Sequence, residues 1–199
     1  MKDGESIILA NGEFPKRGGT AWKALADAKY VVCCDGAADA YRRRFHRSPD
    51  VVVGDCDSLH GKYENIVIID EQDTNDLEKA ICYCRQHNII KPLVLGITGK
   101  RDDHTLGNIF RAFAYGLDVL TNFGRFIYVK KRLSLSVKVG TPISVFAMSP
   151  ATKMSSTGLE WALKGVKFDN LYCATLNRAN SKKISVTTNY PVYIYVASS

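Results

Sequence analysis

The sequence predicts an α/β domain, a parallel sheet flanked by helices, followed by a smaller all-β sandwich domain. Short apolar runs alternate with helical patterns over the first 122 or so residues. Polar clusters follow each of these runs, and after residue 123 the pattern changes to strands of period two. Strand–helix alternation is typical of a parallel sheet, and period-two segments joined by turns are typical of antiparallel sheets.

Five apolar runs predict the strands of the first domain. They are Ser6–Ala10, Tyr30–Cys34, Val51–Val53, Ile66–Ile69 and Leu93–Ile97. Because these runs are apolar throughout, we expect parallel strands that helices cover on both faces.

Two helices between or after these runs are predicted by apolar residues spaced i, i+3, i+4, i+7. The first set is Leu77, Ala80, Ile81 and Cys84, and the second is Leu106, Ile109, Phe110 and Phe113. Asn75 and Glu78 form a capping-box pattern at the start of the first helix, and Gly116 is a plausible end of the second.

The second domain is predicted by two alternating segments, residues 133–139 and 192–196. Turn signals separate them at Gly140-Thr141-Pro142, Ser149-Pro150 and Asn189-Tyr190-Pro191. We therefore expect domains at residues 1–123 and 124–199, the second a small sandwich.

Composition narrows the class of protein. The 199 residues are 46% hydrophobic and 24% charged, as in an ordinary globular protein, with a net charge of +7. The basic clusters are short and scattered and no nucleic-acid-binding motif is present, so we expect surface charge and no nucleic-acid partner. The absence of a membrane-length apolar run and of a signal peptide predicts no membrane partner and a cytoplasmic location. The spacing of the six cysteines predicts buried thiols rather than disulfides or a metal–thiolate site.

Polar residues follow every predicted strand of the first domain. The clusters are Asn11-Gly12, Asp35-Gly36, Gly54–Ser58, Asp70–Asp76 and Thr98–His104. If the strands are parallel, all five clusters lie at the carboxyl edge of one sheet, where open α/β sheets bind ligands. Any single aspartate could be a turn former or a helix cap, but five coincident clusters favour a site.

The side chains in these clusters favour a Mg²⁺-dependent site for a phosphorylated substrate, most simply a nucleotide. Asp55, Asp57 and Asp76 supply the hard oxygen ligands that Mg²⁺ requires. Lys79 is placed to reach a phosphate or, alternatively, to form an exposed pair with Asp76. Arg101 is suited to bidentate phosphate contact.

Two further observations refine that prediction. Asp103 and His104 are either plain capping residues or candidates for proton transfer. Glycines at 12, 54 and 99 permit tight turns, but no phosphate-loop or dinucleotide-binding glycine motif is present.

Six motifs together resemble the thiamin pyrophosphokinase family. In chain order they read DGAADA, PDVVVGDCDS, QDTNDLEKA, GITGKRDDHTLGN, TGLEWAL and ATLNRA. The resemblance implies a homodimeric enzyme that transfers the pyrophosphoryl group of ATP to the hydroxyl of thiamine. It also implies that the first domain binds ATP and Mg²⁺ and performs catalysis, and that the second contributes to thiamine binding and dimerisation.

The resemblance also assigns residues. The metal set is Asp55, Asp57 and Asp76, and the catalytic set is Asp57, Asp76, Lys79, Arg101, Asp103 and His104. The substrate-binding set is Asn11, Asp35, Ser58, Gln72 and Asp73 on the nucleotide side, with Trp161 and Asn177 on the thiamine side. An aromatic face such as Trp161 suits the thiazolium cation, although core packing is the alternative for this residue.

The chain departs from the family pattern at several positions. The usual Gly-Gly-Arg is Gly99-Lys100-Arg101, the usual Asp-Gly-Gly is Asp35-Gly36-Ala37, and Asn75 replaces a threonine. Leu176 and Arg178 replace a serine and an acidic residue on the acceptor side. The changes at Leu176 and Arg178 leave open a Mg²⁺-dependent phosphotransferase or hydrolase with another acceptor. A second alternative also stays open: a non-catalytic nucleotide or thiamine sensor, or a nucleic-acid-binding protein that uses the net charge of +7.

Overall fold

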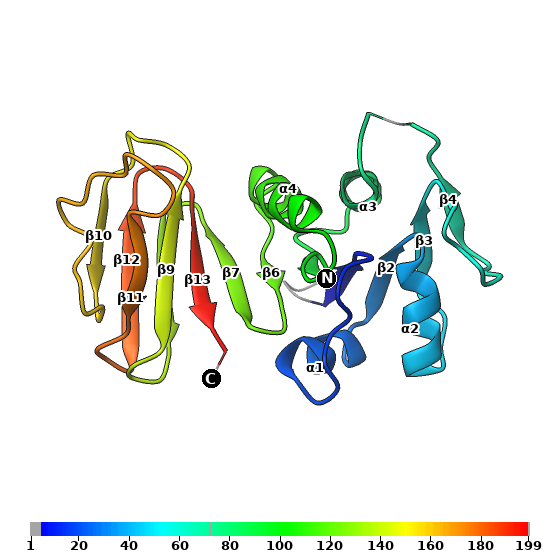
Figure 1. Ribbon diagram of the computed structural model, residues 1–199, viewed down its shortest axis with the longest axis horizontal. Coiled ribbons are helices and arrows are strands. Elements are labelled where there is room, and N and C mark those ends of the chain that lie inside the picture. Colours follow the sequence, from blue (N-terminus) through cyan, green and yellow to red (C-terminus); the bar gives the residue numbers. More distant parts are fainter. Residues whose placement is uncertain (1–4, 72, 199) are drawn as a thin grey trace. The chain divides into compact units, whose positions relative to one another are not determined.

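The computed structural model describes residues 5–71 and 73–198. The chain divides into two compact units, the first ending at Asn122 and the second beginning at Phe123 (Figure 1). Among the described residues, none of the helices has the length and apolar character needed to cross a membrane.

The first unit contains a parallel sheet with the strand order β6-β5-β1-β2-β3-β4. The strands are β1 (Ser6–Leu9), β2 (Tyr30–Cys34), β3 (Val51–Gly54), β4 (Ile66–Ile68), β5 (Leu93–Leu95) and β6 (Val119–Leu120). The chain first proceeds outward from β1 to β4 and then returns to place β5 on the other side of β1. The strand order therefore reverses between β1 and β5, the kind of position where open α/β sheets bind ligands.

Helices cover both faces of this sheet, which confirms the α/β prediction. They are α1 (Thr20–Ala26), α2 (Ala37–Phe45), α3 (Asp76–Gln86) and α4 (Asp102–Ala114). In Figure 1, α1 and α2 lie on one side of the sheet, and α3 and α4 lie on the other. Ile7 and Leu9 pack with Leu25 of α1 and Tyr41 of α2, because alternate residues of a strand face the same side.

The helix pattern is confirmed more fully for α3 than for α4. All four apolar positions predicted for α3 are buried. In α4, Leu106 and Phe110 are 57% and 37% exposed, and Ala112 is the buried residue. Since α4 connects β5 and β6, which have three and two residues, the strands that it connects offer little apolar surface to cover.

The predicted helix ends are mostly confirmed. Asn75 is the N-cap of α3, where its Oδ1 accepts a hydrogen bond from the Glu78 backbone N–H at 3.0 Å. The capping box also predicts that the Glu78 side chain accepts a hydrogen bond from the Asn75 backbone N–H, and this part is wrong. The Glu78 carboxylate instead accepts a hydrogen bond from the Tyr115 hydroxyl at 2.7 Å and pairs with Arg111. Gly116, with a φ of +70°, follows the C-cap of α4 as predicted.

The prediction of a sheet covered on both faces is wrong for β4. Ile66 and Ile68 are 37% and 68% exposed. β4 is the edge strand of the sheet, and residues 55–65, which connect it to β3, form a loop rather than a covering helix.

The second unit is all-β, as predicted. Its strands are β7 (Gly124–Val129), β8 (Arg132–Ser136), β9 (Pro142–Ala147), β10 (Met154–Thr157), β11 (Ala174–Arg178), β12 (Lys183–Thr188) and β13 (Val192–Ala197). The strands pair antiparallel in the orders β11-β9-β13-β7 and β10-β12-β8. Val145 and Ile194 from the first set share one core with Met154, Ile184 and Val186 from the second, which makes this unit a sandwich.

Candidate active site

A pocket of about 450 Å³ lies where the strand order reverses in the first unit. Its wall includes the segments Ala10–Gly12 and Gly96–Thr98, which follow β1 and β5. The volume is within the range of small-molecule sites. The carboxyl edge of the sheet is therefore hollowed at the position that the strand-end clusters predict.

Backbone hydrogen bonds fix the floor of this pocket. The Gly12 N–H donates to the Gly96 carbonyl at 2.6 Å, and the Glu13 N–H donates to the Thr98 carbonyl at 2.6 Å. A Cβ atom on Gly12 would lie 2.7 Å from the Thr98 oxygen, so this approach of the two loops requires glycine. The residues that follow β1 and β5 are consequently held at constant separation.

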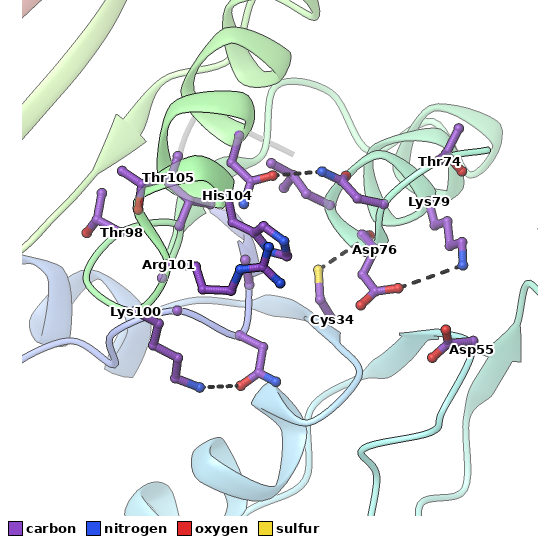
Figure 2. A pocket seen from close by; sticks show the side chains of 18 residues that line it. Cys34, Asp55, Thr74, Asp76, Lys79, Thr98, Lys100, Arg101, His104 and Thr105 are labelled. Carbon is purple, nitrogen blue, oxygen red and sulfur yellow. Dashed lines mark hydrogen bonds and ion pairs between the residues drawn. The ribbon is translucent and has the colours of Figure 1, made fainter. Parts of the chain in front are cut away.

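One side of the pocket carries Asp55, after β3, and Asp76, at the start of α3 (Figure 2). Burial raises the pKa of Asp76, the negative charge of Asp55 raises it further, and the nearby ammonium of Lys79 opposes both effects. Lys79 is only 4% exposed and its Nζ lies 3.8 Å from Asp76 Oδ1. The i,i+3 pair considered from the sequence is thus present, but Lys79 is buried rather than exposed.

The opposite side carries Lys100, Arg101 and His104 (Figure 2). The Arg101 guanidinium donates to both carboxylate oxygens of Asp103, at 3.1 and 2.6 Å. These bonds, together with one from the His104 backbone N–H, lower the pKa of Asp103 to about 2. Asp103 therefore stays ionised and is engaged with Arg101.

The loop after β3 is anchored by Asp35, which lies at the end of β2. Asp35 is 4% exposed, and its Oδ2 accepts hydrogen bonds from the Ser58 N–H at 3.2 Å and from the Ser58 hydroxyl. Asp57 is exposed on this loop, and its backbone N–H donates to Asp55 Oδ1 at 3.3 Å. Asp35 and Cys56 have φ values of +35° and +68°, which are uncommon for residues other than glycine. Two strained backbone positions therefore lie in the segments beside the pocket.

The acidic residues fit a divalent cation in part. Among the described residues, no three aspartate, glutamate, histidine or cysteine side chains are close enough together to hold an ion by themselves. Even so, Asp35 Oδ1 is buried without a hydrogen-bond partner in the described chain, and Asp35, Asp55 and Asp57 all raise the pKa of Asp76. Mg²⁺ is commonly held by one or two carboxylates plus substrate phosphates, so Asp55 and Asp76 suit such an ion.

The structure brings together about half of the residues predicted for the nucleotide side. Asn11, Asp55, Asp76, Lys79, Arg101 and His104 line the pocket. Asp35, Asp57, Ser58, Asp73 and Asp103 are not among its lining residues. Gln72 lies outside the described residues.

Sequence reasoning missed several polar residues of the pocket. Thr74, Thr98, Thr105 and Asn108 also line it. Asn108 Oδ1 accepts a hydrogen bond from Asn75 Nδ2 at 2.9 Å, which connects α4 to the N-cap of α3. Thr74 and Thr98 belong to the strand-end clusters, and Thr105 and Asn108 lie four residues after Arg101 and His104, so strand-end position and helical spacing were available signals.

Trp161 and Asn177 lie in the second unit, where they form a separate cluster. The Asn177 side chain is 4% exposed and forms two hydrogen bonds with the backbone of Trp161. Its Nδ2 donates to the Trp161 backbone carbonyl at 2.7 Å, and its Oδ1 accepts from the Trp161 backbone N–H at 3.2 Å. The Trp161 side chain is 52% exposed and the Arg178 guanidinium lies 5.9 Å from its ring centroid. Asn177 therefore holds the backbone that presents an exposed indole.

Two family models match consecutive parts of the chain. The model described as thiamin pyrophosphokinase, catalytic domain, matches residues 21–119. The model described as thiamin pyrophosphokinase, substrate-binding domain, matches residues 124–195. Together these matches span most of the chain.

Individual proteins agree with these models. The chain is 27% identical to thiamine pyrophosphokinase 1 of Arabidopsis thaliana over 92% of its length and 82% of the relative. It is also 27% identical to thiamine pyrophosphokinase 1 of Oryza sativa subsp. japonica, over 79% of its length and 73% of the relative.

Solved structures share the fold. Thiamin pyrophosphokinase from Candida albicans superposes with a TM-score of 0.80 at 16% identity, covering 98% of this chain and 89% of that one. A thiamin pyrophosphokinase family protein from Enterococcus faecalis gives a TM-score of 0.79 at 15% identity, covering 98% of both chains. By its two family models, its relatives and its fold, the chain belongs to the thiamin pyrophosphokinase family.

Proposed function

We propose that this chain transfers the pyrophosphoryl group of ATP to the hydroxyl of thiamine, giving thiamine diphosphate and AMP. The observation that carries the proposal is that both family models, catalytic and substrate-binding, match consecutive parts of the chain. The pocket supports it independently, because it places carboxylates opposite cations at the carboxyl edge of a parallel sheet. Such a site suits a metal–polyphosphate.

We assign the carboxylates of the pocket to Mg²⁺ and its basic side chains to the triphosphate. Asp55 and Asp76 would hold Mg²⁺ together with phosphate oxygens, with Asp57 contributing from the exposed loop. Bound there, the ion would neutralise charge on the triphosphate. Lys79 and Arg101 would bind phosphate oxygens from opposite sides.

The transfer itself needs an oriented alcohol and a proton acceptor. The thiamine hydroxyl oxygen attacks the β-phosphorus of ATP, the bond from that phosphorus to the oxygen bridging to the α-phosphate breaks, and AMP leaves. Asp103, with a pKa of about 2 and both oxygens bonded to Arg101, serves better to orient that guanidinium than to take the hydroxyl proton. His104 lines the pocket, so we assign it as the proton acceptor.

The second unit would supply the thiamine contact. The exposed indole of Trp161 offers an aromatic face to the thiazolium cation, and Asn177 acts by holding the Trp161 backbone. Homodimer formation and a cytoplasmic location complete the proposal. The first follows from the family resemblance, and the second agrees with six cysteines that carry free thiols, three of them buried.

The reaction is tested by incubating the purified protein with ATP, Mg²⁺ and thiamine and analysing the products by mass spectrometry. Equal amounts of thiamine diphosphate and AMP are expected. Thiamine monophosphate with ADP would indicate transfer of a single phosphoryl group. ATP consumption that does not depend on thiamine would contradict the proposal and direct attention to another acceptor.

The acceptor assignment is tested by Trp161→Ala. Loss of a cation–π contact of 0.5–2 kcal/mol predicts a rise of roughly 2- to 30-fold in the KM for thiamine. The KM for ATP and the melting temperature should stay close to those of the wild type, because the indole is half exposed. Equal increases in both KM values would show that Trp161 supports the fold rather than the acceptor.

A further inference from the structure

Lys100 extends into the pocket from the loop that follows β5, and its charge is not used by the roles assigned so far. Its Nζ donates a hydrogen bond to Asn11 Oδ1 at 3.0 Å, in the loop that follows β1 (Figure 2). Both residues are exposed and both line the pocket. The ammonium therefore lies at the mouth of the cavity, where the strand order reverses.

The other two cations of the pocket are paired with carboxylates. Lys79 lies 3.8 Å from Asp76, and Arg101 binds Asp103 at 2.6 Å. Within the described chain, the hydrogen-bond partner of Lys100 is a neutral amide and it forms no ion pair. Lys100 therefore gives the pocket a positive charge that forms no ion pair with a carboxylate of the described residues.

The backbone that carries Lys100 is fixed. The segment before it is held to the loop after β1 by the Gly12–Gly96 and Glu13–Thr98 hydrogen bonds. Gly99 has a φ of +84° and a Cβ atom there would meet Glu13, so the last residue before Lys100 is packed closely as well. A cation on a fixed backbone loses less conformational freedom when it binds an anion.

We propose that Lys100 binds the polyphosphate of the nucleotide and makes affinity depend on the number of phosphate groups. The identity of the anion rests on the proposed function; the role of Lys100 as an anion ligand rests on its unpaired charge and its position. When the Lys100 ammonium exchanges the neutral amide oxygen of Asn11 for a charged phosphate oxygen, its hydrogen bond becomes stronger, because both partners are then charged. Asn11 then holds Lys100 in place until the nucleotide arrives.

The alternative role for Lys100 is structural, a tie between the two loops. The backbone bonds already join these loops, so this role predicts little loss of nucleotide affinity on removal of the ammonium. A structural tie would also affect all nucleotides equally.

The experiment compares Lys100→Met with the matched control Lys29→Met, which also removes one positive charge. Lys29 is an exposed lysine of the same unit, paired with Glu5 and not among the lining residues. Binding of AMP, ADP and ATP is measured by calorimetry with Mg²⁺ and without thiamine, so that no turnover is required. We expect Lys100→Met to weaken ATP binding by about tenfold, the loss of one hydrogen bond to a charged group, with a smaller effect on ADP and the smallest on AMP. Lys29→Met should bind all three as the wild type does.

Lys100→Arg adds a second variant that keeps the charge, and it should retain most of the ATP affinity. An unchanged ATP affinity in Lys100→Met would overturn the proposal. So would an equal loss for all three nucleotides, or a loss in Lys100→Arg as large as in Lys100→Met. Because binding is measured without an acceptor, a graded loss supports the role of Lys100 even if thiamine is never converted.

Discussion

α3 and α4 begin on opposite sides of the same pocket, but different forces hold the charged side chains at their starts. Lys79 of α3 is buried, and the apolar face of that helix packs into the core. At the start of α4, the Arg101 and Asp103 side chains are 67% and 63% exposed and are fixed mainly by each other. Substitutions in α3 should therefore test charge placed by packing, whereas substitutions at the start of α4 should test charge placed by local hydrogen bonds.

The two helices are also joined directly. Asn75 Nδ2 donates to Asn108 Oδ1, and Glu78 of α3 binds both Tyr115 and Arg111. Since Glu78 is 8% exposed, this second contact is a largely buried charged link. The separation between the two sides of the pocket thus depends on polar contacts as well as on the sheet.

The largest effect is expected for Lys79→Met. The loss of a preorganised buried cation beside the proposed phosphate site should lower kcat/KM by about 10²- to 10³-fold, the range for removing one electrostatic stabiliser. The free energy of unfolding should also fall, by about 1–3 kcal/mol, because the half-buried Asp76 carboxylate loses its cation and stays beside Asp55. Steady-state kinetics and urea denaturation provide both numbers. A folded variant with wild-type turnover would show that the buried ammonium of Lys79 has no role in the reaction.

Arg101→Lys is expected to have the next largest effect. Lysine keeps the charge but cannot make the paired contacts of a guanidinium, so kcat/KM should fall about tenfold. The melting temperature should not change, because the Arg101–Asp103 pair is on the surface. Kinetics with ATP as the varied substrate, together with thermal denaturation, checks both statements. Wild-type kinetics in this variant would mean that charge alone, without geometry, is needed at the start of α4.

These two helices also show how far sequence reasoning extends. For α3, apolar periodicity and the Asn75 cap predicted the helix and its buried face, because packing against the sheet and local capping determine both. For α4, the same periodicity predicted the helix but not the exposure of Leu106 and Phe110, which depends on how much sheet the neighbouring strands provide.

The site was predicted to a similar extent. Strand-end position alone located Asn11, Asp55, Asp76 and Arg101 at one pocket, since parallel strands bring their carboxyl ends to one edge. The anchoring of Ser58 by Asp35 and the hold of Asn177 on the Trp161 backbone were not predicted. These contacts join residues 16 or more positions apart, and no local pattern records which side chain meets which backbone group.

Tyr115→Phe tests the link between the two helices. It removes the 2.7 Å hydrogen bond to Glu78 and should lower the free energy of unfolding by about 1 kcal/mol. The matched control is Tyr30→Phe, which removes a hydroxyl contact between β2 and Tyr83 of α3 without involving α4. If the link sets the separation of the two sides, only Tyr115→Phe should also raise the KM for ATP. Equal kinetics in the two variants would show that the Tyr115–Glu78 hydrogen bond does not set this separation.

The smallest effect is expected for Asp103→Asn, which distinguishes an orienting carboxylate from a proton acceptor. The pKa of Asp103 is lowered to about 2, so the stability that its ionised form contributes is present above its unfolded value of about 3.9 and is lost only as the pH falls below that value. Asp103→Asn should therefore shift the melting temperature equally at pH values of about 5 and 8, and only slightly, because the group is exposed.

The pH–rate profile of Asp103→Asn tests more directly whether Asp103 accepts the hydroxyl proton. Asparagine can accept one of the two Arg101 bonds but carries no charge, so the KM for ATP should rise a few-fold as the guanidinium becomes less ordered. The acid limb of kcat/KM should stay at the wild-type pH, since a carboxyl with a pKa of about 2 does not titrate in the working range. If the acid limb disappears in Asp103→Asn, Asp103 rather than His104 takes the hydroxyl proton, and its bonds to Arg101 do not keep it from acting as a base.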